Sequence, residues 1–113
     1  MKMFDFNAVR KPTWPVKLGD ADGTIVHLSY PTLALAERLT ALAEEIGDIA
    51  ASKDGRAIRR AFDIIAEVMT CNEDGFAFTA EDMRDKYNMS LLVMAQFTAG
   101  YLEFLQEAKD AKN

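Results

Sequence analysis

The segment from Leu91 to Leu105 constrains the fold of this chain more than any other part of the sequence. Eleven of its fifteen residues are apolar, and the four exceptions are Gln96, Thr98, Gly100 and Glu103. Three of these exceptions, together with Glu107, recur at spacings of 4, 3 and 4 residues, which predicts one narrow polar stripe on a helix over 90–108. A helix that is apolar around nearly all of its circumference must be buried on several sides.

Two arrangements satisfy this requirement. Either the helix is the centre of the chain's own core, or it divides its surface between that core and a second chain. The second arrangement predicts self-association, with the first helix of the chain packed against the opposite side. Its candidate partner-binding residues are Leu92, Val93, Phe97, Tyr101 and Phe104.

The first third of the sequence predicts a β-hairpin over 14–30, preceded by an N-terminal arm over 1–12. Residues 14–18 and 24–30 are rich in β-branched and aromatic side chains, and the glycines and aspartates between them tolerate positive φ. In the second strand we expect Val26, Leu28 and Tyr30 to face the core, because side chains alternate along a strand. Pro15 has no amide hydrogen, so the first strand is expected at an edge.

The remaining periodicity predicts helices, so the expected fold is α+β and mostly α: the hairpin followed by about four helices in one core. Pro31 suits the start of a first helix that ends near Ser52, although Gly47 weakens it and predicts a bend or an early end. The next two helices are expected over about 58–69 and, capped by Thr79, over about 80–87. We therefore expect a single domain over 1–113, with a helical part over 31–108 and a flexible tail over 109–113.

Composition excludes several classes of protein. A chain of 113 residues has room for one core, and a net charge of −5 disfavours sequence-blind binding to nucleic acid. Residues 61–113 carry four basic and ten acidic side chains, which suits either a solvated surface or a face for a basic partner. A single cysteine and the lack of a long apolar run predict a cytoplasmic protein without disulfides or membrane contact.

The residues that could carry chemistry are few, and they predict neither an enzyme nor a bound cofactor. His27 is the only histidine, and Cys71 has no histidine near it in sequence. Asn72, Asp74 and Glu81 stand at the spacing of an EF-hand calcium loop, but Thr70 occupies the first position, where the loop needs an aspartate. We therefore interpret this segment as a turn followed by a helix start, without a metal.

Two short segments carry a family resemblance. Tyr30-Pro31-Thr32 follows the predicted hairpin, and Phe78 to Met83 precedes the last helices. In this order the chain resembles the small tail assembly chaperones of long-tailed bacteriophages with non-contractile tails. The alternative is a small oligomeric helical adaptor or regulatory protein of phage or bacterial origin.

The resemblance implies a non-enzymatic chaperone that coats the tape measure protein and, in a longer frameshifted form, recruits tail tube subunits. The family has no catalytic residues to carry over to this sequence. Ala111-Lys112-Asn113 can be encoded by a heptamer on which ribosomes slip back by one base. The last codons of the gene are therefore a test of the longer form.

Overall fold

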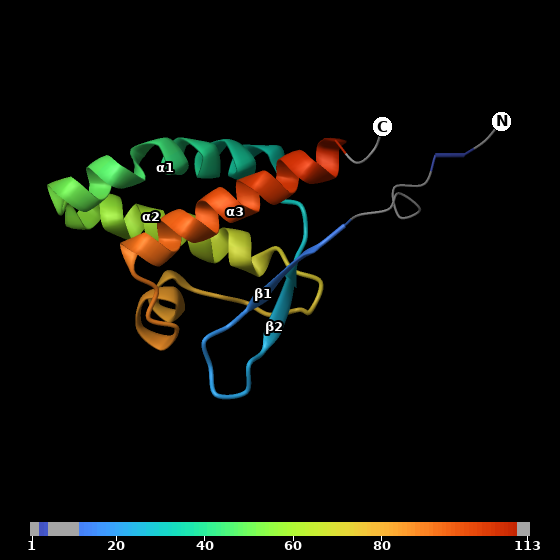
Figure 1. The fold of residues 1–113 in the computed structure, drawn as a ribbon, viewed down its shortest axis with the longest axis horizontal. Coiled ribbons are helices and arrows are strands. Elements are labelled where there is room, and N and C mark those ends of the chain that lie inside the picture. The colour runs from blue at the N-terminus through green and yellow to red at the C-terminus, as the bar shows by residue number, and fades with distance from the viewer. Residues whose placement is uncertain (1–2, 5–11, 111–113) are drawn as a thin grey trace.

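The computed structural model describes residues 3–4 and 12–110 (Figure 1). Its elements are the strands β1 (Trp14–Lys17) and β2 (Ile25–Leu28) and the helices α1 (Leu33–Ser52), α2 (Gly55–Thr70), η2 (Asp82–Lys86) and α3 (Leu91–Asp110). The expected arm over 1–12 is described only at Met3, Phe4 and Pro12, and 111–113 of the expected tail lie outside the described residues. α3 continues to Asp110, two residues beyond the predicted helix end at 108.

The hairpin forms with the predicted faces. β1 and β2 are antiparallel, with Trp14 opposite Leu28, and the Leu18 N–H extends the ladder by donating to the Thr24 carbonyl at 2.8 Å. The loop is closed by Asp20, whose carboxylate accepts from the Thr24 N–H and hydroxyl at 2.9 and 2.7 Å. Val26 and Leu28 are fully buried, as predicted for the core face of the second strand.

A third segment covers the free edge of β2. The residues that follow α2 run alongside this strand, where Leu28 and Asn72 form an isolated bridge. The Ser29 N–H donates to the Cys71 carbonyl at 2.9 Å, and the Glu73 N–H donates to the His27 carbonyl at 3.0 Å. Backbone groups at the C-terminal end of β2 are thereby paired, which covers that part of the strand edge.

α1 and α2 form an antiparallel pair joined by a tight turn at Lys53, whose φ is 57°. Thr32 caps α1 by accepting from the Leu35 N–H at 3.2 Å, so Pro31 precedes the cap and is not the first helical residue as we expected. Asp54 caps α2 in the same way. The early end considered at Gly47 does not occur, because α1 continues to Ser52.

The segment before α3 contains a short wide helix. Thr79 and Asp82 cap each other, with Asp82 N–H to Thr79 Oγ1 at 3.1 Å and Thr79 N–H to Asp82 Oδ2 at 3.0 Å, as a capping box does. The next turn is a π-helix, closed by the Tyr87 N–H on the Asp82 carbonyl at 2.9 Å. Asn88 then takes a left-handed φ of 51°, and α3 begins at Leu91.

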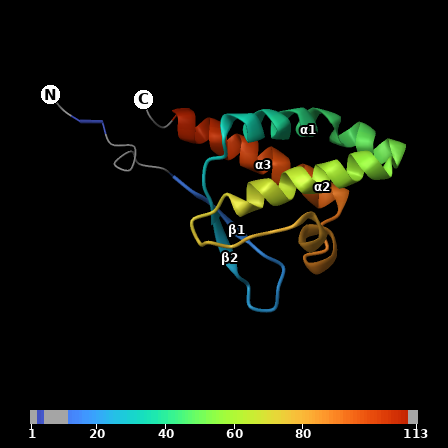
Figure 2. The ribbon, with the colours of Figure 1, turned by 180° about the vertical axis from the view of Figure 1, so that it is seen from behind.

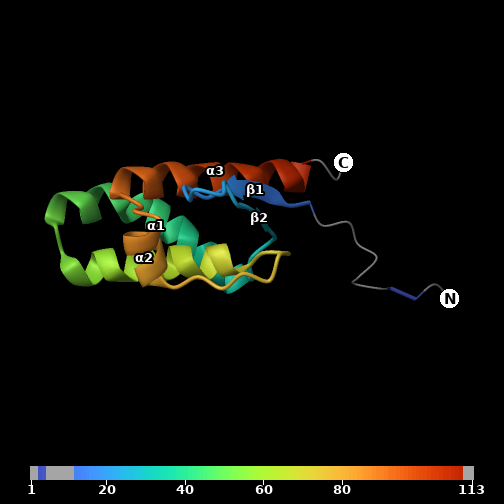
Figure 3. The same ribbon diagram turned by 90° about the horizontal axis from the view of Figure 1, so that it is seen from below.

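The core lies between α1 and the elements around it. α1 contacts both α2 and α3, and it runs antiparallel to each of them (Figure 1). Seen from below, α3 and the hairpin lie on one side of the molecule and α2 lies on the other (Figure 3). The predicted fold class is confirmed: a hairpin followed by four helices packs around one cluster of buried side chains.

Candidate protein-binding groove

An aromatic cluster fixes α3 on the hairpin. The Trp14 ring of β1 lies 5.6 Å from Phe97, 5.7 Å from Tyr101 and 6.3 Å from Phe104, measured between ring centroids. The Trp14 ring packs closely against Gly100, where a Cβ would lie only 3.0 Å from Trp14 Cζ2. The polar stripe predicted on α3 is thus interrupted at Gly100 by the hairpin.

A buried hydrogen bond completes this contact. The Tyr101 hydroxyl donates to the Ser29 carbonyl at 2.6 Å, and Tyr101 has no exposed surface. Burial raises the pKa of Tyr101 well above its ordinary range, so its phenol stays a neutral donor at physiological pH. α3 is therefore held to the end of β2 by a directional bond as well as by ring packing.

The five candidate partner-binding residues do not share one surface. Tyr101 belongs to the core and is closed to a partner, and the half-buried Phe97 and Phe104 pack on Trp14. Leu92 and Val93 are exposed, at 69% and 45% of their surface. Most of the apolar circumference of α3 is therefore covered within the chain, and its large exposed apolar side chains are confined to the first turn.

A groove of about 260 Å³ begins beside this first turn. We call it the Met-lined groove. One wall is formed by the end of β1 and the following loop, residues 16–19. The other wall is formed by the η2 segment and the start of α3, with Met83, residues 87–89, Val93 and Phe97. Met69 of α2 lies at the floor. Two of the five candidate residues, Val93 and Phe97, are thus brought together in it.

The lining of this groove is apolar and adaptable. Met69 is buried at its floor, Met83 is buried in its wall, and Met89 is half-buried in the same wall. Methionine side chains are unbranched and flexible, so a surface built on them can adjust to partners of different shape. The periodicity of α3 pointed to Val93 and Phe97, but the other wall comes from the hairpin and the η2 segment, which no local pattern connects to α3.

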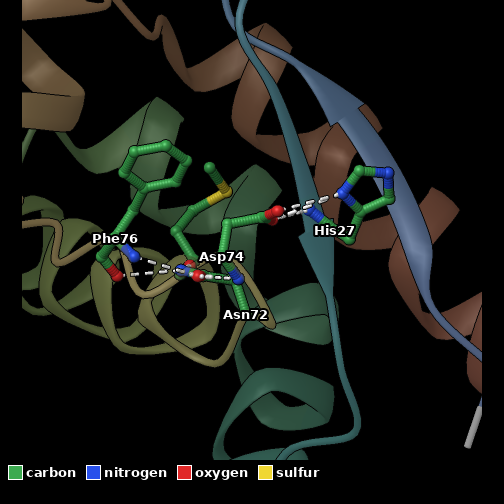
Figure 4. A network of polar contacts seen from close by, with 5 residues as sticks. His27, Asn72, Asp74 and Phe76 are labelled. Atoms are coloured by element: carbon green, nitrogen blue, oxygen red, sulfur yellow. Dashed lines mark hydrogen bonds and ion pairs between the residues drawn. The ribbon is translucent and has the colours of Figure 1, made fainter.

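In the segment with EF-hand spacing, the side chain of Asn72 is engaged in hydrogen bonds within the loop (Figure 4). Asn72 Oδ1 accepts from the N–H groups of Asp74 and Phe76 at 3.0 and 3.1 Å, and Asn72 Nδ2 donates to the carbonyls of Met69 and Phe76 at 2.8 Å. Gly75, with φ of 76°, provides the turn. The described residues contain no group of three or more His, Cys, Asp or Glu side chains placed to hold a metal ion.

Hydrogen bonds between His27 and Asp74 join this loop to β2. The His27 N–H donates to Asp74 Oδ2 at 2.7 Å, and His27 Nδ1 lies 3.3 Å from both carboxylate oxygens (Figure 4). This backbone hydrogen bond is the main reason that the pKa of Asp74 lies below its ordinary value. The pair closes the edge of β2, which is a structural role.

Cys71 is half-buried beside α2. Burial, and after it the negative charge of Glu67, raises the pKa of the Cys71 thiol. A raised pKa keeps the thiol protonated and makes it a weak nucleophile.

The comparisons with protein-family models, curated proteins and solved structures give no match to this chain. Within the described residues, no helix has both the length and the apolar character needed to cross a bilayer.

Proposed function

We propose that this protein is a phage tail assembly chaperone that holds helical segments of the tape measure protein in the host cytoplasm and helps to recruit tail tube subunits. It acts through apolar surface and performs no catalysis. The observation that carries the proposal is the Met-lined groove, which is lined by Val93 at the start of α3. Val93 and its sequence neighbour Leu92 are both exposed. The family resemblance of the sequence supports the choice of partner.

The groove suits an amphipathic helix. Helix-in-groove recognition places apolar anchors of the guest helix, spaced three or four residues apart, into a preformed apolar channel. Fully burying a side chain such as Leu92 or Val93 stabilises a complex by roughly 1.5–3 kcal/mol. A few such contacts give reversible binding, which suits a protein that must release its client during assembly.

The walls of the groove are held in place by packing and hydrogen bonding, whereas its methionine side chains are flexible. Trp14 and the Tyr101–Ser29 hydrogen bond hold α3 on the hairpin, so the two walls keep their relative position. The methionines between them supply side chains that can repack around different apolar residues. A long helical client offers many such segments, and one adaptable groove can hold each of them.

Co-expression with the tape measure protein encoded beside this gene tests the proposal. Leu92→Glu and Val93→Asp should each lower the soluble fraction of the client several-fold. Both residues lie in the first turn of α3, where an acidic side chain interacts favourably with the helix dipole, so the fold should persist. Phe97 and Phe104 are poorer choices because charges there would disturb the contact with Trp14.

The matched control is Leu33→Glu. Leu33 is 77% exposed and lies in the first turn of α1, at the opposite end of the helical layer from Leu92 (Figure 1). This variant loses a similar exposed apolar side chain without touching the groove, so the client should remain soluble. Equal loss of solubility with all three variants, or no effect of the wild-type chain on the client, would reject the proposal.

A further inference from the structure

The outer face of the α1–α2 pair carries a second recessed surface. Figure 2 shows these helices antiparallel, with α3 on their far side. Two hollows of about 680 and 200 Å³ lie along the seam between α1 and α2, and both are lined by Arg38. They share no lining residue with the Met-lined groove. We call this surface the α1–α2 seam.

The charges along the seam are arranged in opposite pairs. In the smaller hollow Glu45 of α1 and Arg60 of α2 line opposite sides. In the larger hollow Arg38 of α1 stands across from Asp63 and Glu67 of α2, and Arg38 Nη2 lies 2.7 Å from Glu67 Oε2. All five side chains belong to exposed residues. In both of these sets, Glu45 with Arg60 and Arg38 with Asp63 and Glu67, the charge on α1 is opposite to the charge on α2.

This arrangement makes the surface complementary to itself. A two-fold axis along the seam places α1 of one copy over α2 of the other, antiparallel to it and at the same level along the axis. Glu45 of each copy then meets Arg60 of the other, and Arg38 meets Asp63 and Glu67. We propose that the α1–α2 seam is the site at which two copies of this chain pair, as an antiparallel four-helix bundle.

The composition of the seam favours a second copy over a strongly charged partner. Its charged side chains are two arginines and three acids, so the surface has almost no net field with which to attract a basic or an acidic segment. Ala34 and Ala41 of α1 and Ala57 of α2 line the hollows without projecting from them. Small side chains at a helix contact allow the axes to approach closely.

Pairing at the seam leaves the Met-lined groove of each copy open, because the two surfaces have no residue in common. The inference concerns the self-association that the proposed function expects, but it does not depend on the client. Its test uses the purified chain alone, so its failure would be distinct from a failure of client binding.

The test is the mass in solution, measured by light scattering during size-exclusion chromatography. The wild-type chain should give twice 12.6 kDa. Glu45→Arg makes both facing positions positive, and Arg60→Glu makes both negative, so each variant should repel its own copy and give 12.6 kDa. Because both residues are exposed, the helical content of each variant should match that of the wild type.

Mixing the two monomeric variants provides the sharpest result. In the mixed pair every contact between positions 45 and 60 of different chains is again between opposite charges, so a dimer should return. The control variant Leu92→Glu should dimerise like the wild type, because Leu92 is not part of the seam. A monomeric wild type, failure of the mixture to dimerise, or loss of the dimer in Leu92→Glu alone would each overturn the inference.

Discussion

Two tyrosines close to each other offer a sharp test of how α3 is attached to the hairpin. The Tyr101 hydroxyl is buried and donates to the Ser29 carbonyl at 2.6 Å. The Tyr30 hydroxyl is also buried, but it has no hydrogen-bond partner in the described part of the chain. Removing the hydroxyl oxygen should therefore destabilise the chain at Tyr101 but not at Tyr30.

Tyr101→Phe leaves the Ser29 carbonyl without its partner and should lower the free energy of unfolding by about 1–3 kcal/mol. In a domain of about this size, that loss lowers the melting temperature by roughly 4–8 °C for each kcal/mol. Tyr30→Phe removes a buried hydroxyl that gains nothing from the fold, so stability should be unchanged or slightly increased. Urea denaturation followed by circular dichroism measures both.

The pH dependence adds a second readout. Burial raises the pKa of Tyr101 in the folded chain, whereas the unfolded chain has the ordinary value of about 10. The stability that comes from keeping the Tyr101 phenol neutral is therefore fully present below about pH 10. This stability is lost as the pH rises above that value. The difference in stability between the wild type and Tyr101→Phe should shrink in that range. Equal losses in the two variants, or a difference that grows with pH, would refute the role given to this hydrogen bond.

Three further substitutions test how the hairpin is held to α3 and to the segment that follows α2. Trp14→Ala removes the ring that packs over Gly100 and should cost about 3–5 kcal/mol in urea denaturation, with a smaller loss indicating that α3 docks without it. Asp74→Asn should lower the melting temperature at neutral pH but not at acid pH, because the stability from a carboxylate with a lowered pKa is lost as pH falls through that pKa. Gly75→Ala forces a side chain into a left-handed backbone conformation and should cost roughly 1–2 kcal/mol, measured in the same way.

Local patterns in the sequence predicted most of the elements of this fold. The alternation around Val26 and Leu28 identified the buried face of β2, and the apolar spacings identified α1, α2 and α3. The helix starts were less certain, because Pro31 and Thr32 are both acceptable N-terminal residues and only the cap geometry decides between them. The π-turn of η2 is closed by a backbone hydrogen bond between residues five apart in sequence, and it leaves no periodic pattern of apolar residues.

The exposure of α3 could not be read from its own residues. Its apolar circumference is covered on one side by Trp14, which lies far away in sequence and reaches the helix at Gly100. Periodicity marks Gly100 as a gap in the apolar pattern, but it does not say what fills that gap. Periodicity therefore places Tyr101 with Leu92 among the candidate partner-binding residues. The structure buries Tyr101 and exposes Leu92.

Photo-crosslinking tests the central claim most directly, because it reports which surface of this chain touches the proposed client. A photoreactive amino acid at Leu92 should capture the co-expressed tape measure protein, since this side chain is 69% exposed and its sequence neighbour Val93 lines the Met-lined groove. The same amino acid at Leu33, which is 77% exposed at the far end of the helical layer, should not capture it. Capture from Leu33 alone, or equal capture from both positions, would contradict the assignment of the groove as the client-binding site.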